Sequence, residues 1–517
     1  MVDSLEPREW EGEGLRREYA DLEITRAKLA PIGPSERELS RLGAPDDSVF
    51  DERLKDLDRP LKIEQVFSGL RGHVAKRLVY LWRPIFFVLR PFFRVVSIPF
   101  LKLSLITRFD EVQEVLARDD IFRTPFRAKA ARLNWAPPFL LDQQYGADYR
   151  AVKEDVQRLF AAVNTDVRQM FKRTDLEDFA RWAFEYANEI LDKKISGKAT
   201  AEIDAIRELV CRVPTRVCQK YYGVTSLAKL SEDELREYED CFITVSSYLF
   251  GSAAEPTEEF GPDKQTRRVM QAAVIIRAKI HEAIEQAWKD RANHVQRDDV
   301  LFRMILDDTK EPDPAGGEKR RFDDARMTSY VFGMMLGCIP TTLMANGNML
   351  EILFSRRPDK ELAFAMRAAR EDDDDLLRRY LFEAMRFRPL NPGPWRKANV
   401  KFLLAADTKR PKKLKEGWTI WPSTQSAMFD SRRVHEPRKF DVDRSPYIYM
   451  LYGYGLHRCI AKPMADAQIT QTMKALFLRE NLRPASGRRA KLKRISMFPH
   501  RMMLRYDAAG STQQTAP

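Results

Sequence analysis

The sequence predicts a mainly α-helical protein with a small β region. Residues 155–310 show the spacing of amphipathic helices almost throughout, and residues 323–357 form one long apolar helical pattern. Residues 100–105 instead alternate between apolar and polar side chains, which is typical of a half-buried strand. Because 44% of the 517 residues are hydrophobic, the chain can bury a sizeable core, and its length allows either two or three domains or a single large α-rich unit.

The two ends of the chain differ from the rest in composition. Residues 1–60 are charged and interrupted by prolines, so we expect an extension docked on a main body formed by residues 61–506. Residues 507–517 are small and polar, which predicts a disordered tail.

Residues 79–100 are strongly apolar, but Arg83, Arg90 and Arg94 interrupt them too often for a transmembrane helix. One interpretation is an entry helix with ordinary core packing. The other is a peripheral segment on a membrane surface, where arginine and aromatic side chains are both accommodated.

The other connecting segments have simpler patterns. Residues 110–122 predict a helix directly after the strand, and the acidic and proline-containing residues 307–321 predict a loop. The lysine-rich residues 409–415 predict a solvated hairpin, and residues 417–429 predict a return to the sheet.

Charge and cysteine content limit the partners and the compartment. Lys and Arg number 88 against 76 Asp and Glu, and this net charge of +12 favours acidic protein partners or an anionic membrane. Zinc-ligand spacing and aromatic-basic RNA motifs are absent from the sequence, so we do not expect nucleic-acid binding. Five scattered cysteines indicate a reducing compartment, and the N-terminus is too charged for a signal peptide. We therefore expect a cytoplasmic protein, and a monomer.

One cysteine lies between a glycine-rich bend and a helix. Gly453 and Gly455 permit backbone angles that a side chain would forbid, and Pro463 and the apolar residues after it predict a helix. The amide dipoles at a helix N-terminus favour a thiolate at Cys459, which suits a metal ligand. The alternative is a buried structural cysteine in a glycine-rich turn.

This loop resembles the haem loop of the cytochrome P-450 superfamily. The family has an aromatic residue, a glycine three positions later, a basic residue two before the cysteine and a small residue two after it; Tyr452, Gly455, His457, Cys459 and Ala461 take those places. Tyr replaces the usual Phe, and Ala replaces the usual Gly. The resemblance implies the P-450 fold and a haem b, with Cys459 as its axial ligand and His457 beside a propionate, as in soluble bacterial members.

Two arginines are further candidates for the propionates by the same resemblance. Asp142 and Arg150 have the spacing of the acid and arginine on the family's haem-side helix, whereas Gly146 stands where the histidine would be. Arg150 is therefore either a propionate ligand or a solvated arginine on an amphipathic helix. Arg396 takes the place of the family's strand arginine for the other propionate.

The long apolar helix resembles the family's central distal helix. Gly337 to Thr342 match its small-Gly-x-acid-Thr-Thr pattern except that Pro340 replaces the acid. Proline can bend a helix, but it cannot carry a proton. Thr341 and Thr342 are thus candidate catalytic residues that hold a hydrogen bond to iron-bound oxygen. Asn346 and Asn348 are candidates for substrate or oxygen contact or for ordinary packing.

Three charged residues resemble the family's structural set. Glu383 and Arg386 lie at i and i+3 on one helix face, and Arg444 follows a proline-containing loop. We expect them to support folding and haem retention rather than chemistry.

The resemblance implies an oxidoreductase, for which three hypotheses stay open. The first is a monooxygenase that uses dioxygen and electrons from an acidic ferredoxin or flavoprotein reductase to oxidise a small apolar or lipid-like substrate. The second is a peroxygenase or hydroperoxide isomerase, which the loss of the acid at Pro340 favours. The third is a non-catalytic haem sensor.

Overall fold

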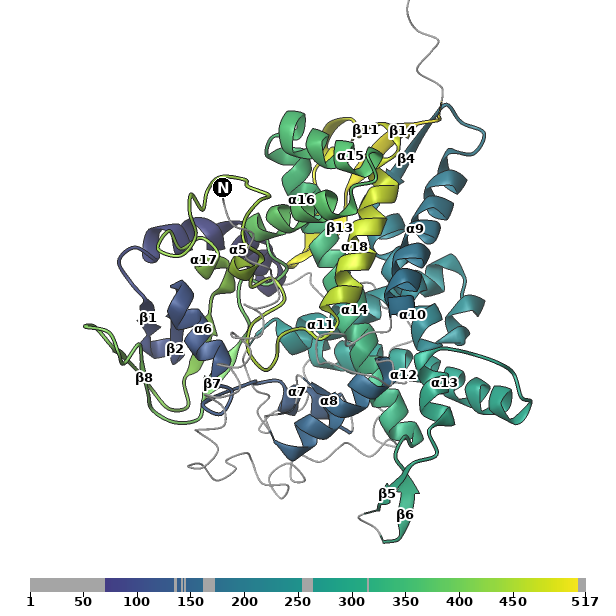
Figure 1. Cartoon of the computed structure of the whole chain (residues 1–517), viewed down its shortest axis with the longest axis horizontal. Helices are drawn as coiled ribbons and strands as arrows, with labels where there is room; N and C mark the ends of the chain where they lie inside the picture. The colour runs from purple at the N-terminus through teal and green to yellow at the C-terminus, as the bar shows by residue number, and fades with distance from the viewer. Residues whose placement is uncertain are drawn as a thin grey trace, which may run out of the picture.

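A computed structural model describes residues 70–133, 137–140, 143, 146–160, 173–252, 264–313 and 316–509. The predicted N-terminal extension at residues 1–60 lies outside the described residues, and so does Asp142. Helices dominate the described chain, and the sheets are small and lie at its margins (Figure 1).

The helices agree with the predicted apolar patterns. In chain order they are α5 (Leu70–Leu89), α6 (Phe109–Ala117), α7 (Arg127–Arg132), α8 (Ala147–Phe160), α9 (Arg173–Ile195), α10 (Arg212–Tyr222), α11 (Glu232–Phe250), α12 (Lys264–Ala292), α13 (Val300–Leu306), α14 (Asp324–Ser355), α15 (Ala363–Arg370), α16 (Asp374–Phe387), α17 (Thr424–Ala427) and α18 (Lys462–Phe477).

The larger sheet has five short strands in the order β1-β2-β10-β7-β3. Its β2 and β10 pair in parallel, and the other pairs are antiparallel. These strands are β1 (Val95–Ile98), β2 (Leu103–Ile106), β3 (Phe122–Arg123), β7 (Arg396–Ala398) and β10 (Thr419–Pro422). The sheet thus joins the N-terminal strands to the segment before the cysteine loop.

A second sheet has the order β11-β14-β4, and three hairpins complete the β structure. The sheet contains β4 (Thr200–Asp204), β11 (Glu480–Pro484) and β14 (Met503–Asp507), and the hairpins are β5 (Lys310–Pro312) with β6 (Glu318–Arg320), β8 (Phe402–Leu404) with β9 (Lys412–Leu414), and β12 (Lys493–Ile495) with β13 (Phe498–Arg501).

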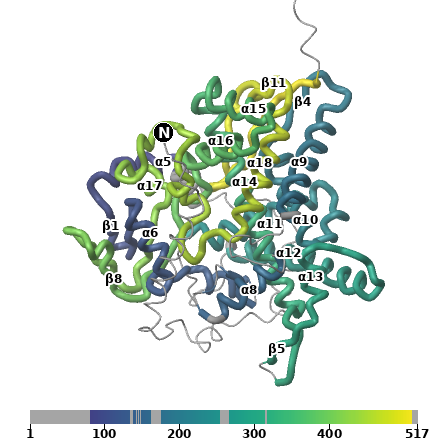
Figure 2. The backbone as a smooth tube through the Cα atoms, in the orientation of Figure 1, coloured from purple at the N-terminus to yellow at the C-terminus, as the bar shows by residue number. Residues whose placement is uncertain are grey.

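Helix α14 passes through the core, as its apolar pattern predicts. Asp323 caps its N-terminus by accepting a hydrogen bond from the Arg326 N–H, and residues along nearly every side of the helix are buried. The helices α10, α11, α12, α16 and α18 pack around it (Figure 2). By length and composition α14 could cross a membrane, but 83% of its most apolar window is buried inside the protein.

Four local predictions need correction. The predicted strand at residues 100–105 starts at Leu103, after a short 3-10 turn. The predicted helix at 110–122 ends at Ala117, and the predicted loop at 307–321 contains the β5-β6 hairpin. Asp507 is the last residue of β14 and pairs with both neighbouring strands, so the tail begins later than predicted.

Candidate functional site

The loop before α18 is fixed by its glycines and by two hydrogen bonds. The Cys459 N–H donates to the Tyr452 carbonyl over 2.9 Å, and the Tyr452 hydroxyl donates to Asp466 of α18 over 2.7 Å. Gly455 has a φ of +73°, and a Cβ there would lie 2.2 Å from the Leu116 carbonyl oxygen. Only glycine therefore allows this close approach of the loop to α6.

Cys459 is an exposed residue, yet burial raises the pKa of its thiol to about 11. The sequence-based prediction of an easily formed thiolate is wrong for the metal-free protein, because desolvation outweighs the Ala461 N–H and the Lys462 charge that favour the anion. A bound metal ion deprotonates a coordinating thiol, so this pKa does not argue against ligation.

A buried polar cluster surrounds His457. Its Nε2 lies 3.0 Å from Oδ1 of Asp119, and the two side chains are 3% and 1% exposed. The Tyr149 ring of α8 stands edge-on to the imidazole at 5.1 Å, and its hydroxyl donates to the Leu456 carbonyl over 3.1 Å. Despite the short distance to Asp119, neither ring nitrogen of His457 has a partner in hydrogen-bond geometry among the described residues.

Arg396 of β7 belongs to the same cluster. Burial lowers the pKa of its guanidinium, whereas the nearby Asp119 charge acts in the opposite direction. Its Nη1 donates to the Trp395 carbonyl over 3.0 Å, but its buried Nε has no hydrogen-bond partner in the described chain. Buried donors of this kind suit an anionic group, and the propionates of a haem are such a group.

Arg150 lies on α8 next to Tyr149, but its side chain is exposed. The α8 residue that contacts His457 is therefore Tyr149, and the propionate role of Arg150 stays a prediction. Asp119 and Tyr149 were missed because neither belongs to a recognisable motif; only their place beside His457 in the fold reveals them.

One face of α14 is open although the helix is otherwise buried. Gly337 is exposed, and Cys338 and Thr341 are only half-buried. Position 337 has no atom within 4 Å of where a Cβ would stand. The Cys338 thiol of α14 contributes to the raised pKa of Cys459. Of the two candidate threonines, Thr341 faces this opening, whereas Thr342 is buried.

Helix α14 continues without interruption through Pro340. The Thr341 hydroxyl donates to the Gly337 carbonyl and, over 3.2 Å, to the Cys338 carbonyl. The predicted bend at Pro340 stays a prediction.

The two asparagines of α14 have different surroundings. Asn348 has a packing role, since it donates to the Pro389 carbonyl and accepts from Arg494. Asn346 is fully buried, and its amide has no hydrogen-bond partner within the described ranges.

The structure brings Glu383, Arg386 and Arg444 together. Arg386 donates to both Glu383 oxygens over 2.7 and 2.8 Å, and the two side chains are fully buried. Arg444 Nε lies 3.3 Å from Glu383. The Tyr449 hydroxyl and the Asp441 N–H also donate to this carboxylate.

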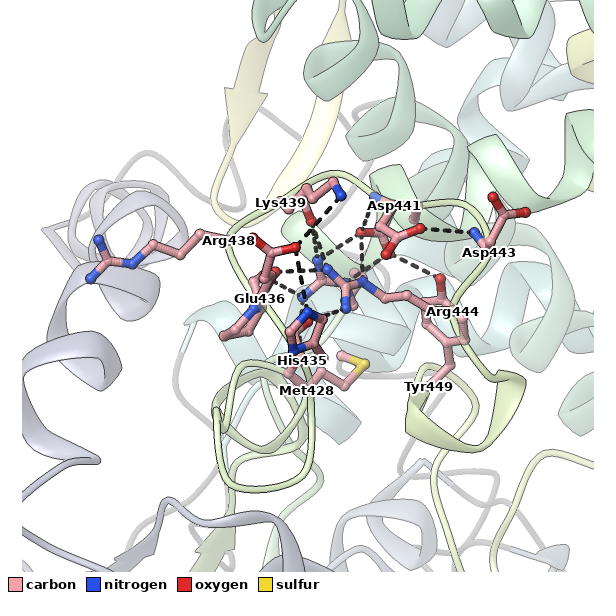
Figure 3. Close-up of polar contacts among 12 residues, drawn as sticks. Met428, His435, Glu436, Arg438, Lys439, Asp441, Asp443, Arg444 and Tyr449 are labelled. Atoms are coloured by element: carbon pink, nitrogen blue, oxygen red, sulfur yellow. Dashed lines mark hydrogen bonds and ion pairs between the residues drawn. The ribbon is translucent and has the colours of Figure 1, made fainter. Parts of the chain in front are cut away.

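The segment 435–449 wraps around this cluster (Figure 3). Arg386 donates to the Met428, Pro437 and Lys439 carbonyls, so the buried charges are fully hydrogen-bonded. Burial and Glu383 raise the pKa of Tyr449, which keeps its hydroxyl a donor. This cluster fixes residues 437–449, which lead into the cysteine loop, so its role is structural rather than catalytic.

Comparisons with known proteins agree with this architecture. No family model matches the chain. The chain is 21% identical over 392 residues to mycinamicin IV hydroxylase/epoxidase from Micromonospora griseorubida, covering 72% of this chain and 81% of that protein. It is 31% identical over 150 residues to psi-producing oxygenase A from Aspergillus fumigatus, but this match spans only 28% of the chain and 14% of the oxygenase.

A second partial match is to a bifunctional dioxygenase-epoxy alcohol synthase from Pyricularia oryzae, at 28% identity over 25% of the chain and 11% of that protein. Among solved structures, a cytochrome P-450 from Chondromyces apiculatus superposes with a TM-score of 0.61 at 17% identity, covering 84% of this chain and 97% of that one. A cytochrome P-450 from Bacillus megaterium in complex with corticosterone gives 0.60 at 18% identity, with coverages of 84% and 100%.

Proposed function

We propose that this chain, which shares the fold of cytochrome P-450 structures, is a haem-thiolate monooxygenase of the cytochrome P-450 superfamily that oxidises a small apolar or lipid-like substrate. The observation that carries the proposal is the Cys459 loop before α18, together with the buried donors of His457 and Arg396 that have no hydrogen-bond partner in the described chain. A cysteine thiolate ligand gives haem iron the electron density that favours cleavage of the O–O bond.

The residues present fit a haem, and we assign it as haem b. Cys459 would be the axial ligand, and the unsatisfied donors of His457 and Arg396 would hold the propionates. Bound haem supplies the oxidation chemistry, which no protein side chain can provide. The protein contributes the thiolate, the binding of the acidic groups and a water-poor space for an apolar substrate.

Proton delivery in this protein differs from the family's acid-alcohol pair. Pro340 has no proton to donate, and the Thr341 hydroxyl is bonded to carbonyls of its own helix. Thr341 can hold an oxygen atom of the bound oxidant, but ordered water or substrate must supply the proton behind it.

The second candidate is a peroxide-using peroxygenase or a fatty-acid hydroperoxide isomerase. The absence of an acid at Pro340 favours it, because peroxide arrives already reduced and protonated. The partial similarity to a bifunctional dioxygenase-epoxy alcohol synthase also supports this second candidate. A haem sensor without turnover is the third candidate.

A redox partner of the dioxygen reaction would be acidic. The chain carries a net charge of +12, which favours docking of an acidic ferredoxin or flavoprotein. We propose a cytoplasmic bacterial protein that can touch a membrane through residues 79–100, where several apolar side chains are exposed: Leu81, Phe87, Val88, Phe92, Phe93 and Phe100.

The experiment that tests the proposal compares turnover of a panel of apolar substrates with two oxidants. One arm contains dioxygen, NADPH or NADH, and a ferredoxin with its reductase; the other contains hydrogen peroxide alone. Product formation that requires the redox partner supports the monooxygenase. Turnover with peroxide alone favours the second candidate, and no product in either arm favours the sensor.

A further inference from the structure

A cavity lies away from the residues assigned to the haem. It has a volume of about 990 Å³ and is bounded by α5, the C-terminal end of α16 and residues 425–439. None of its lining residues is a candidate ligand of the haem or its propionates. Any ligand of this cavity is therefore distinct from the haem.

Its lining is strongly cationic. Six basic residues and two acidic residues line the cavity: Arg83, Arg90, Arg388, Arg432, Arg438 and Lys439, with Asp430 and Glu436. Both carboxylates already have basic partners in the lining, since Asp430 accepts from Arg432 over 2.9 Å and Glu436 lies 3.5 Å from Lys439. The other cations keep a surplus of positive charge.

Arg83 is the clearest of these unneutralised cations. Its guanidinium lies over the rings of Phe387 and Phe429, at 4.6 and 4.9 Å from their centroids. No described residue gives it a hydrogen bond or an ion pair. Burial, together with neighbouring guanidiniums such as Arg388 and Arg438, lowers the pKa of Arg83 to about 10, so the side chain is still charged at pH 7.

Two other arginines are only partly satisfied. Arg388 Nη1 lies 3.4 Å from Glu351, but neither Nη1 nor Nε makes a hydrogen bond within the described chain. Arg438 stacks on Phe87 at 3.9 Å. Figure 3 shows Arg438 pointing away from Asp441 and Arg444 toward the purple N-terminal part of the chain. Cations from three elements thus converge on one space.

The walls of the cavity are also apolar. Four phenylalanines line it: Phe86, Phe387 and Phe429 are buried, whereas Phe87 is 46% exposed. Guanidiniums bind carboxylates and phosphates with two parallel hydrogen bonds, and aromatic walls accept a hydrocarbon chain. We propose that this cavity binds an anionic amphiphile, with its carboxylate or phosphate at Arg83 and Arg438 and its apolar tail against Phe87.

The test is isothermal titration of the full-length haem protein with decyl phosphate below its micelle concentration. Decyl maltoside provides the same tail with a neutral head, and inorganic phosphate provides the head without the tail. Arg83→Gln and Arg438→Gln remove the proposed partners; because Arg438 is exposed, its variant keeps the test valid if Arg83→Gln does not fold. Arg433→Gln is the matched control, since Arg433 is nearby but pairs with Asp110 and does not line the cavity.

We expect decyl phosphate to bind at least tenfold more tightly than either comparison ligand. Arg83→Gln and Arg438→Gln should each weaken it at least fivefold, and Arg433→Gln should change it less than twofold. Equal binding of decyl maltoside, or equal effects of all three variants, would overturn the proposal. Binding of decyl phosphate beside the haem would shift the Soret band. Any such shift should be the same in Arg83→Gln as in the wild type, because Arg83 lines the other cavity.

Two sources of the anion are then distinguished with vesicles. If phosphatidylglycerol vesicles displace decyl phosphate from the wild type but not from Arg83→Gln, the natural ligand is the headgroup of a membrane lipid. If the vesicles do not compete, the ligand is a free amphiphile such as a fatty acid.

Discussion

At the scale of single residues, burial decides properties that a sequence motif suggests only in part. The helix start after Cys459 predicts a low thiol pKa, but the protein interior raises the pKa to about 11. The i, i+3 pair Glu383 and Arg386 could have been an ordinary surface pair, yet both side chains are fully buried. Sequence spacing identified these residues, and only the fold shows how strongly each depends on its partners.

Glu383→Ala should remove most soluble haem protein. The variant leaves Arg386 and Arg444 buried without their carboxylate, a loss of about 3–5 kcal/mol in the free energy of unfolding. Soluble yield and urea denaturation measure the effect. The control is Glu371→Ala, which breaks an exposed i, i+4 pair with Arg367 and should change stability far less, because solvent screens this pair. Similar losses in the two variants would show that burial of the Glu383 cluster is unimportant.

Gly455→Ala should lower haem content more than Gly487→Ala does. Both glycines have a φ near +72°, so both variants incur the left-handed backbone cost of about 1–2 kcal/mol. Only at Gly455 would the new methyl group also meet the Leu116 carbonyl, whereas position 487 is open. The ratio of Soret to protein absorbance measures haem content, and equal ratios in the two variants would contradict the close approach of the loop to α6.

At the scale of elements, long helices were predictable and short strands were not. The apolar pattern of α14 identified its course, and its observed start at Asp324 lies within one residue of the prediction. The strands β4 and β14 pair with each other although about 300 residues separate them, and such pairing leaves no local signal. The same reason explains why Asp507 was assigned to the tail.

Asp507 should add stability that disappears in acid. Hydrogen bonds from Arg483, Asn481 and Thr200 lower the pKa of Asp507 to about 2, below the value of about 3.9 in an unfolded chain. A depressed carboxyl pKa stabilises the fold above the unfolded pKa, and this contribution is lost as the pH falls from about 4 to 2. The difference in urea midpoint between the wild type and Asp507→Asn should therefore be smaller at pH 3 than at pH 6.

A control for this titration is Asp359→Asn, because the Asp359 side chain makes no hydrogen bond or ion pair with the described residues. The wild type and this variant should differ little at either pH. A gap between the wild type and Asp507→Asn that does not shrink in acid would contradict the assigned contacts.

Pro340→Glu should raise the coupling of electron use to product formation if dioxygen is the oxidant. The new carboxyl group would restore a proton source on α14, and turnover with peroxide should stay unchanged or fall. Pro340→Ala is the control, since it restores a backbone N–H without an acid. The ratio of product formed to NADPH consumed is the measurement. Equal coupling in the wild type and both variants would show that position 340 does not govern proton delivery.

At the scale of the whole molecule, the order of separated motifs predicted the fold better than any one of them. The cysteine loop, the Glu383 and Arg386 pair, and the threonines of α14 occur along the chain in the order of the family's motifs. The buried partners Asp119, Tyr149 and Tyr449 could not be predicted, because each depends on which distant segment packs against it. The cationic cavity beside α5 is a further product of the fold, since its arginines come from segments about 300 residues apart.

The central claim is that Cys459 binds the iron of a haem as a thiolate, and the spectrum of the reduced protein with carbon monoxide tests it most directly. The wild type should show the red-shifted Soret band that thiolate ligation gives. Cys338→Ala, which alters the cysteine of α14, should keep that band, and Cys459→Ala should lose it. A Cys459→Ala protein with the wild-type spectrum, or a wild type without the shifted band, would contradict the assignment.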